Sequence, residues 1–124
     1  DQLERAMDRM RAIVSDNLPR TDAEIVFRES YPPMAPTAGN LELLAGLDRV
    51  SRDLGMGPIE AVDPGMRGAA DISFAAQHTA ALGGLGVVGR GAHTPDETVD
   101  LGSIPVMAKR AAVLVRRLGT PGTD

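Results

Sequence analysis

The residues best suited to chemistry lie in one short loop that brings an imidazole close to two carboxylates. From Arg90 to Glu97 the sequence reads RGAHTPDE, so His93 follows a glycine-permitted turn and precedes Asp96 and Glu97. Neutral histidine is a common zinc ligand, and a nearby acid can orient its second ring nitrogen. The same pattern describes an exposed loop histidine beside a solvated acidic pair. A metal-ligand loop and a plain surface loop therefore both stay open.

A complete zinc site within this chain is not expected. Zinc is bound by three or four ligands, which are cysteine, histidine, aspartate or glutamate side chains. The chain has no cysteine and two histidines, and the other histidine, His78, lies in an alanine-rich stretch that favours a helix. A core or surface role suits His78 better than metal ligation. The two histidines therefore do not predict a complete zinc site, and the role of His93 stays open at this point.

Two glycine-containing segments have the composition of ligand-binding loops. Gly68 lies in a run that leads into a predicted helix, and the free backbone amides there could bind an anion or a substrate carbonyl. Alternatively, Asp71 simply caps the helix that begins at Ile72. The run over residues 83–86 is not a phosphate-binding loop, because no Lys-Ser or Lys-Thr pair follows it and its glycines precede a strand.

A third candidate for ligand binding is Arg28, which shares one face of a predicted strand with Glu24. The planar guanidinium pairs with a carboxylate through two parallel hydrogen bonds, so Arg28 could hold a substrate carboxylate. Because Glu24 and Glu29 are close in sequence, a surface ion pair is the alternative.

The elements that position these residues begin with an amphipathic helix. Apolar residues recur at three- and four-residue spacing over Leu3–Ser15, which predicts a helix that ends near Ser15. β-branched and aromatic residues predict a strand over Ala23–Ser30. Three prolines then predict an extended linker over residues 31–40. A helix followed by a strand is half of a split α/β lobe, so a boundary is expected here.

The remainder of the chain alternates predicted helices and strands. The first is a helix that Asn40 caps and Gly55 ends, and a strand over Ile59–Val62 follows it. Next come an alanine-rich helix over Ile72–Leu82 and a buried parallel strand over residues 85–88. The last is a helix that begins near Ser103, has Pro105 in its first turn and ends at Gly119. The predicted fold class is therefore α/β, with a partial lobe joined to an incomplete layered segment that contains a short parallel sheet. Open sheets bind ligands in the loops after parallel strands, which singles out the loop of His93.

Composition narrows the class of protein. Apolar residues make up 43% and charged residues 24%, as in soluble globular proteins, while aromatic residues make up only 2%, which predicts a thin core. The net charge of −4 and the single lysine, Lys109, argue against a nucleic acid or an anionic membrane as partner. No apolar stretch is long enough for a membrane helix. The compartment stays open, with the cytoplasm slightly favoured.

Three features together resemble a known family of zinc metallopeptidases. They are the run Arg67–Asp71, the small-residue helix after it, and the stretch Gly86–Leu101, which contains His93. Their order resembles the C-terminal signature of the carboxypeptidase G, aminoacylase and succinyl-diaminopimelate desuccinylase family. The resemblance extends over essentially the whole chain.

The resemblance implies a division of the chain into four parts. These are the end of a dimerising lid lobe (1–30), a linker (31–40), the C-terminal segment of a catalytic domain (41–119) and a tail (120–124). In that family two zinc ions share a bridging carboxylate and hydroxide, a glutamate acts as general base, and lid residues hold the substrate.

The resemblance also implies a role for individual residues. His93 maps onto a metal ligand, while the other ligands and the base belong to an upstream segment that this chain does not contain. The chain is then the C-terminal part of an amide-bond hydrolase that acts on a peptide or an N-acyl amino acid, and it is inactive alone. Gly68 and Arg28 are candidate substrate contacts, and Tyr31 is a candidate replacement for an arginine that some relatives use.

Two other interpretations stay open. Residues 3–30 could form a non-catalytic association module that pairs with another copy and extends a sheet across chains, giving a homo-oligomer. Alternatively, the chain could be a truncation product that folds only by exchanging segments with a neighbour, because its apolar sheet face lacks the missing N-terminal half.

Overall fold

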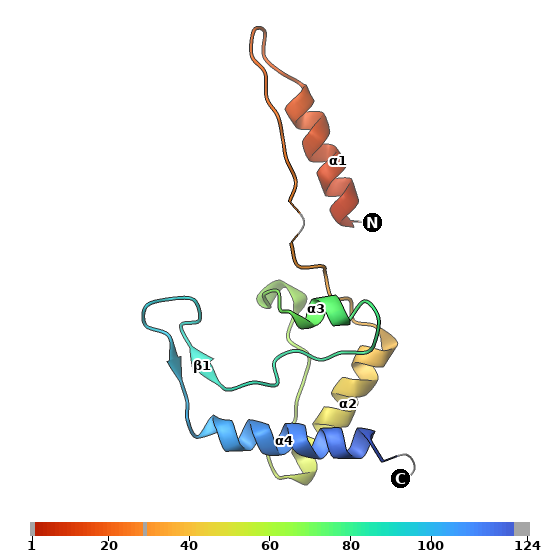
Figure 1. The fold of residues 1–124 in the computed structure, drawn as a ribbon, viewed down its shortest axis with the longest axis vertical. Helices are drawn as coiled ribbons and strands as arrows, with labels where there is room; N and C mark the ends of the chain where they lie inside the picture. The colour runs from red at the N-terminus through yellow and green to blue at the C-terminus, as the bar shows by residue number, and fades with distance from the viewer. Residues whose placement is uncertain (1, 29, 121–124) are drawn as a thin grey trace. The chain divides into compact units, whose positions relative to one another are not determined.

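The computed structural model describes residues 2–28 and 30–120. Glu29, and the predicted tail beyond Thr120, lie outside the described residues. The chain divides into two compact units, residues 1–30 and residues 31–124, and each is described by itself (Figure 1). The assignment of these parts to a lid, a linker and a catalytic domain stays a prediction.

The first unit consists of one helix and a segment that returns along it. Helix α1 spans Gln2–Ser15, which confirms the predicted helix. After α1 the chain reverses direction, and the Arg11 guanidinium lies 4.9 Å from the centre of the Phe27 ring (Figure 1). The predicted strand over Ala23–Ser30 is wrong, because its described residues pair with no other strand. An extended segment becomes a strand only when a neighbour completes its hydrogen-bond ladder.

Helix α2 spans Ala38–Asp53 and is the first helix of the second unit. Thr37 caps it, because the Thr37 side chain accepts a hydrogen bond from the backbone N–H of Asn40 at 3.2 Å. The prediction that Asn40 is the cap is wrong, since the helix begins earlier and the Asn40 side chain is buried. Gly55 follows the helix with a φ of +71°, which confirms it as the left-handed terminator.

The predicted alanine-rich helix is much shorter than its sequence indicates. Helix α3 spans only Ile72–Ala75, after which the chain turns. Buried Asn40 accounts for the early end: its Oδ1 accepts a hydrogen bond from the Ala81 backbone N–H, and its Nδ2 donates to the Ala35 carbonyl, both at 2.8 Å. These bonds hold the chain after α3 against α2, so a tertiary contact overrides helix propensity.

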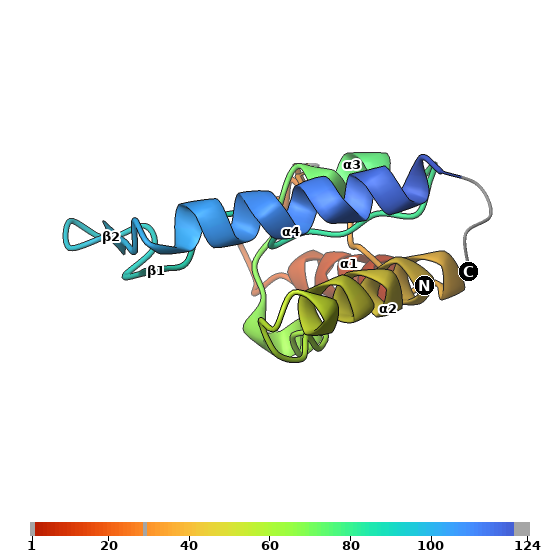
Figure 2. The ribbon, with the colours of Figure 1, turned by 90° about the horizontal axis from the view of Figure 1, so that it is seen from below.

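The sheet is a short antiparallel hairpin rather than the parallel sheet that the sequence predicts. Strand β1 spans Gly89–Arg90 and pairs with strand β2, Thr98–Val99 (Figure 2). The predicted strands over residues 85–88 and Ile59–Val62 are wrong, and the valines of the first are exposed. Parallel strands need neighbours and covered faces, which the described residues do not provide. The described chain is therefore mostly helical with one small sheet.

Helix α4 spans Ser103–Leu118 and packs against α2, as Figures 1 and 2 show. It confirms the last predicted helix, with Pro105 in the first turn. Leu47 and Val50 of α2 and Leu114 of α4 form the buried core, which is thin, as the composition predicts. No described helix is long and apolar enough to cross a membrane.

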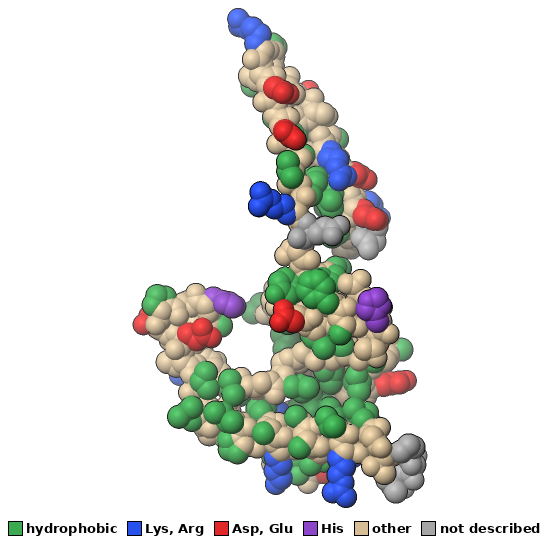
Figure 3. Space-filling view, viewed as in Figure 1, with side chains coloured by type: hydrophobic (Ala, Val, Ile, Leu, Met, Phe, Trp, Pro, Cys, Tyr) green, Lys and Arg blue, Asp and Glu red, His purple; other side chains and the backbone are tan. Residues whose placement is uncertain are grey.

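Much of the apolar surface of the second unit stays exposed. Phe74, Leu101 and Val115, for example, have exposed fractions of 52%, 73% and 68%. Figure 3 shows apolar side chains gathered on the visible face of this unit, over α4 and the segments beside it. Apolar surface of this kind is typical of regions that contact another polypeptide.

Candidate functional site

The histidine loop, residues 91–97, joins β1 to β2 and is held together by its own groups. The backbone N–H and the hydroxyl of Thr94 both donate to the Gly91 carbonyl, at 3.0 Å and 2.7 Å. The Glu97 N–H donates to the Thr94 carbonyl at 3.1 Å. Gly91 has a φ of +65°, and a Cβ there would lie 3.2 Å from the Asp96 carbonyl oxygen. The loop is thus a compact turn that is stabilised by hydrogen bonds between its own residues.

His93 itself has a left-handed backbone, with a φ of +65°. This conformation is uncommon for residues other than glycine and costs on the order of 1 kcal/mol or more. The Glu97 carboxylate stabilises it, because Oε2 accepts a hydrogen bond from the His93 backbone N–H at 3.3 Å. Glu97 therefore contacts the backbone of His93 rather than the second ring nitrogen, and the His93 side chain is exposed.

The described residues do not by themselves fit a complete metal site. Among them, no group of three or more His, Cys, Asp or Glu side chains is close enough to hold a metal ion. His78 is exposed in the turn after α3 and forms no such group with His93. Within the described chain, His93 remains a single candidate ligand.

The glycine loop, residues 67–71, presents backbone donors to solvent. Gly68 is exposed, and no atom lies within 4 Å of the position that a Cβ would take. The N–H groups of Gly68, Ala69 and Ala70 have no hydrogen-bond acceptor in the described part of the chain. Asp71 does occupy the N-cap position of α3, but its side chain makes no capping bond to that helix.

Asp71 instead binds Tyr31, a contact that sequence spacing does not reveal because 40 residues separate the two. The Tyr31 hydroxyl donates to Asp71 Oδ1 at 2.9 Å, and the Tyr31 ring packs on Phe74 with centroids 5.3 Å apart. The Asp71 carboxylate raises the pKa of Tyr31 above its usual range, first by accepting its hydrogen bond and then by its negative charge. Both effects favour the neutral phenol over the phenolate.

Arg28 belongs to the first unit, where its side chain is exposed. The structure describes no ion pair between Arg28 and Glu24, and the other predicted partner, Glu29, lies outside the described residues. Its guanidinium is therefore available for an acidic ligand as far as the described residues extend. Both the substrate contact and the surface ion pair with Glu29 stay predictions.

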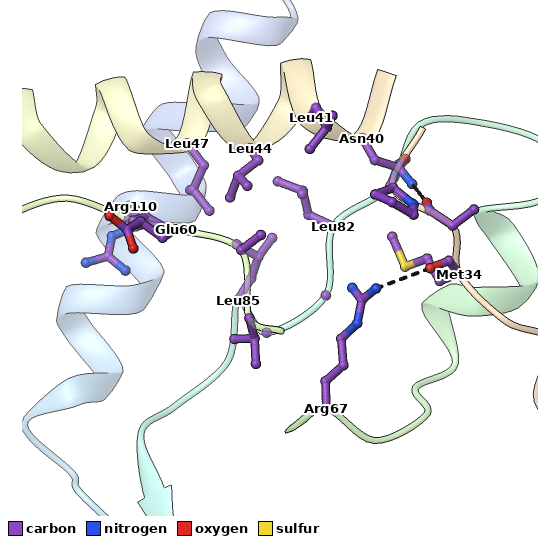
Figure 4. A pocket seen from close by; sticks show the side chains of 18 of the residues that line it. Met34, Asn40, Leu41, Leu44, Leu47, Glu60, Arg67, Leu82, Leu85 and Arg110 are labelled. Carbon is purple, nitrogen blue, oxygen red and sulfur yellow. Dashed lines mark hydrogen bonds between the residues drawn. The ribbon is translucent and has the colours of Figure 1, made fainter. Parts of the chain in front are cut away.

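A cavity of about 440 Å³ lies between α2 and the segments near residues 59–62 and 81–85. Figure 4 shows Leu41 and Leu44 of α2 facing Leu82 across it. The volume lies in the range of small-molecule sites, roughly 300–1,000 Å³. The histidine loop does not line this cavity. Sequence reasoning did not identify it, because separate stretches of the chain build its wall.

Comparison with known proteins adds one finding to this geometry. The model of a family described as peptidase family M20/M25/M40 matches residues 7–117, a stretch that contains Arg28, the glycine loop and the histidine loop. Comparisons with curated proteins and with solved structures gave no significant match.

Proposed function

The chain belongs to peptidase family M20/M25/M40, and we propose that it is the C-terminal part of a zinc-dependent amide-bond hydrolase to which it contributes His93. Membership of this family supports a hydrolase, and its members are generally metal-dependent. The carboxypeptidase or deacylase type, with a peptide or an N-acyl amino acid as substrate, is the finer part of the proposal.

The observation that carries the proposal is the way the fold presents His93. A preorganised turn holds the His93 backbone in a left-handed conformation and leaves the imidazole exposed. An imidazole placed in this way is accessible to a metal ion that other residues also bind. The remaining ligands would come from another polypeptide segment, since the described residues contain no complete site. A bound zinc ion lowers the pKa of its water to about 7, so that hydroxide is available near neutral pH.

Two further residues are proposed to bind the substrate. The free N–H groups beside Gly68 would donate to a carbonyl or carboxylate oxygen of the substrate. The exposed Arg28 guanidinium would pair with a substrate carboxylate. Neither role requires a side chain of the histidine loop.

The test is hydrolysis by the full-length enzyme that this proposal implies. We expect zinc-dependent cleavage of N-acyl amino acids or short peptides that His93→Ala abolishes without unfolding the protein. His78→Ala is the matched control, because it removes the other histidine of the chain and should leave the rate unchanged. Undiminished hydrolysis by His93→Ala would overturn the assignment.

A second candidate function is association between copies through the first unit. The extended return segment of this unit leaves its backbone without a partner strand, and Val26 on it has an exposed fraction of 70%. Such an edge can pair with the same edge of another copy. Light scattering at increasing concentration should show a dimer that Val26→Lys weakens, and a chain that stays monomeric throughout would exclude this candidate.

A further inference from the structure

Two segments that are distant in sequence are joined at both ends of the glycine loop. At one end, Asp71 accepts the hydrogen bond of the Tyr31 hydroxyl at 2.9 Å. At the other end, Arg67 Nη2 donates to the Met34 carbonyl at 3.4 Å, as Figure 4 shows. We call these two bonds the clasp. The free donors of Gly68 lie between its two points of attachment.

The segment that carries Tyr31 and Met34 is itself fixed to the core. The Ala35 carbonyl accepts a hydrogen bond from the Nδ2 of buried Asn40, and Asn40 also binds Ala81. Thr37 then caps α2, which contributes two of the three core residues. The proline-rich segment that carries the clasp is therefore itself hydrogen-bonded to α2.

Each bond of the clasp has one charged member, the Asp71 carboxylate in one and the Arg67 guanidinium in the other, so their lengths distinguish them. The Tyr31 bond to Asp71 is well within hydrogen-bond range at 2.9 Å, whereas the Arg67 contact with Met34, at 3.4 Å, is near the limit of a hydrogen bond. The Tyr31 ring adds a contact with Phe74, which lies in α3 directly after the glycine loop. Tyr31 thus holds the loop and the helix that follows it together.

We propose that Tyr31, through its hydrogen bond to Asp71, is a positioning residue for the glycine loop and holds the donors around Gly68 in the orientation that binds a substrate oxygen. This inference rests on the proposed function, because it takes Gly68 as a substrate contact. Hydrogen-bond donors that already point at a developing negative charge need no reorganisation during the reaction. A loop whose donors are less well oriented should therefore lower kcat before it weakens substrate binding.

The first experiment examines the clasp without any reaction. The chain has one tyrosine and no tryptophan, so the ultraviolet signal of phenolate formation reports Tyr31 alone. In Asp71→Asn we expect the pKa of Tyr31 to fall toward its ordinary value of about 10. Glu42→Gln is the control, since it removes one exposed carboxylate of α2 and should leave the titration unchanged. Equal titrations of wild type and Asp71→Asn would overturn the clasp.

The second experiment separates positioning from mere stability. Tyr31→Phe keeps the ring contact with Phe74 and removes only the hydroxyl. We expect ¹⁵N relaxation to show lower order at Gly68 and Ala69 in this variant. In the full-length enzyme, kcat should fall about tenfold while KM changes little. If relaxation changes but kcat does not, the positioning role is wrong although the proposed function stands. If no hydrolysis exists at all, the proposed function fails while the titration still decides the clasp.

Discussion

The histidine loop and the glycine loop both present polar groups to solvent, yet they are held in place in opposite ways. Each hydrogen bond that shapes the histidine loop joins residues three or four positions apart. The glycine loop is held by Tyr31 and Met34, which lie 40 and 33 residues from their partners. A local turn keeps its shape when distant parts of the chain change, whereas a clasped loop depends on the packing that brings its partners together.

The largest expected effect weakens the packing of α4 on α2, on which the clasped loop depends. Leu114→Ala deletes a buried side chain between α4 and α2, and we expect the free energy of unfolding to fall by about 2–5 kcal/mol. Urea denaturation measures this loss. Leu118→Ala, whose side chain has an exposed fraction of 59%, should change stability by less than about 0.5 kcal/mol. Similar losses in the two variants would show that the core is not where the structure places it.

The next effect breaks the histidine loop alone. A Cβ on Gly89 would lie 2.7 Å from the Thr98 carbonyl oxygen, so Gly89→Ala should disrupt the pairing of β1 with β2 at a local cost of about 1–3 kcal/mol. Loss of the cross-strand NMR contacts near Val99, with unchanged signals at Gly68, would confirm the separation of the loops. Gly86→Ala is the control, because its added methyl group meets no atom within 4 Å.

A smaller effect loosens the glycine loop alone. Because the pKa of Tyr31 is raised in the folded chain, the clasp contributes its full stability below the ordinary tyrosine pKa and loses it as pH rises through the raised value. At alkaline pH we expect the methyl signals of Ala69 and Ala70 to shift while that of Ala92 in the histidine loop stays constant. In Tyr31→Phe this response should be absent, and a response that persists would assign it to another group.

The smallest effect concerns neither loop. The Ile59 backbone N–H and then Arg52 hold the pKa of Asp48 below its usual range, because both favour the carboxylate. The stability from Asp48 is therefore present above the ordinary aspartate pKa and is lost as pH falls through the lowered value. Asp48→Asn should flatten the acid limb of the stability profile slightly, as measured by thermal unfolding between pH 2 and 6. An unchanged limb would contradict this role.

The same contrast explains what the sequence predicts of the fold. Helices α1, α2 and α4 follow from apolar periodicity, and the end of α2 follows from Gly55, because these signals are local. The predicted strands fail because a strand depends on a neighbour that the described residues do not supply. Helix α3 ends early because Asn40 binds Ala81, which no periodicity encodes.

The two candidate loops also differ in how far local sequence predicts them. The loop of His93 forms a turn where the glycine and the acids in its sequence indicate one, although Glu97 binds backbone instead of imidazole. The sequence leaves the role of Asp71 open between a helix cap and a ligand-binding loop, and it does not indicate the contact with Tyr31, which lies 40 residues away. The turn of the histidine loop is therefore predictable from sequence, while the clasp requires the folded chain.

Zinc titration of the full-length enzyme with ¹⁵N-labelled histidine decides whether His93 is a metal ligand. We predict that the imidazole signal of His93 shifts to its zinc-bound position at stoichiometric zinc, while that of His78 does not move. An unshifted His93 signal in a protein that binds zinc and hydrolyses its substrate would show that His93 is not a metal ligand.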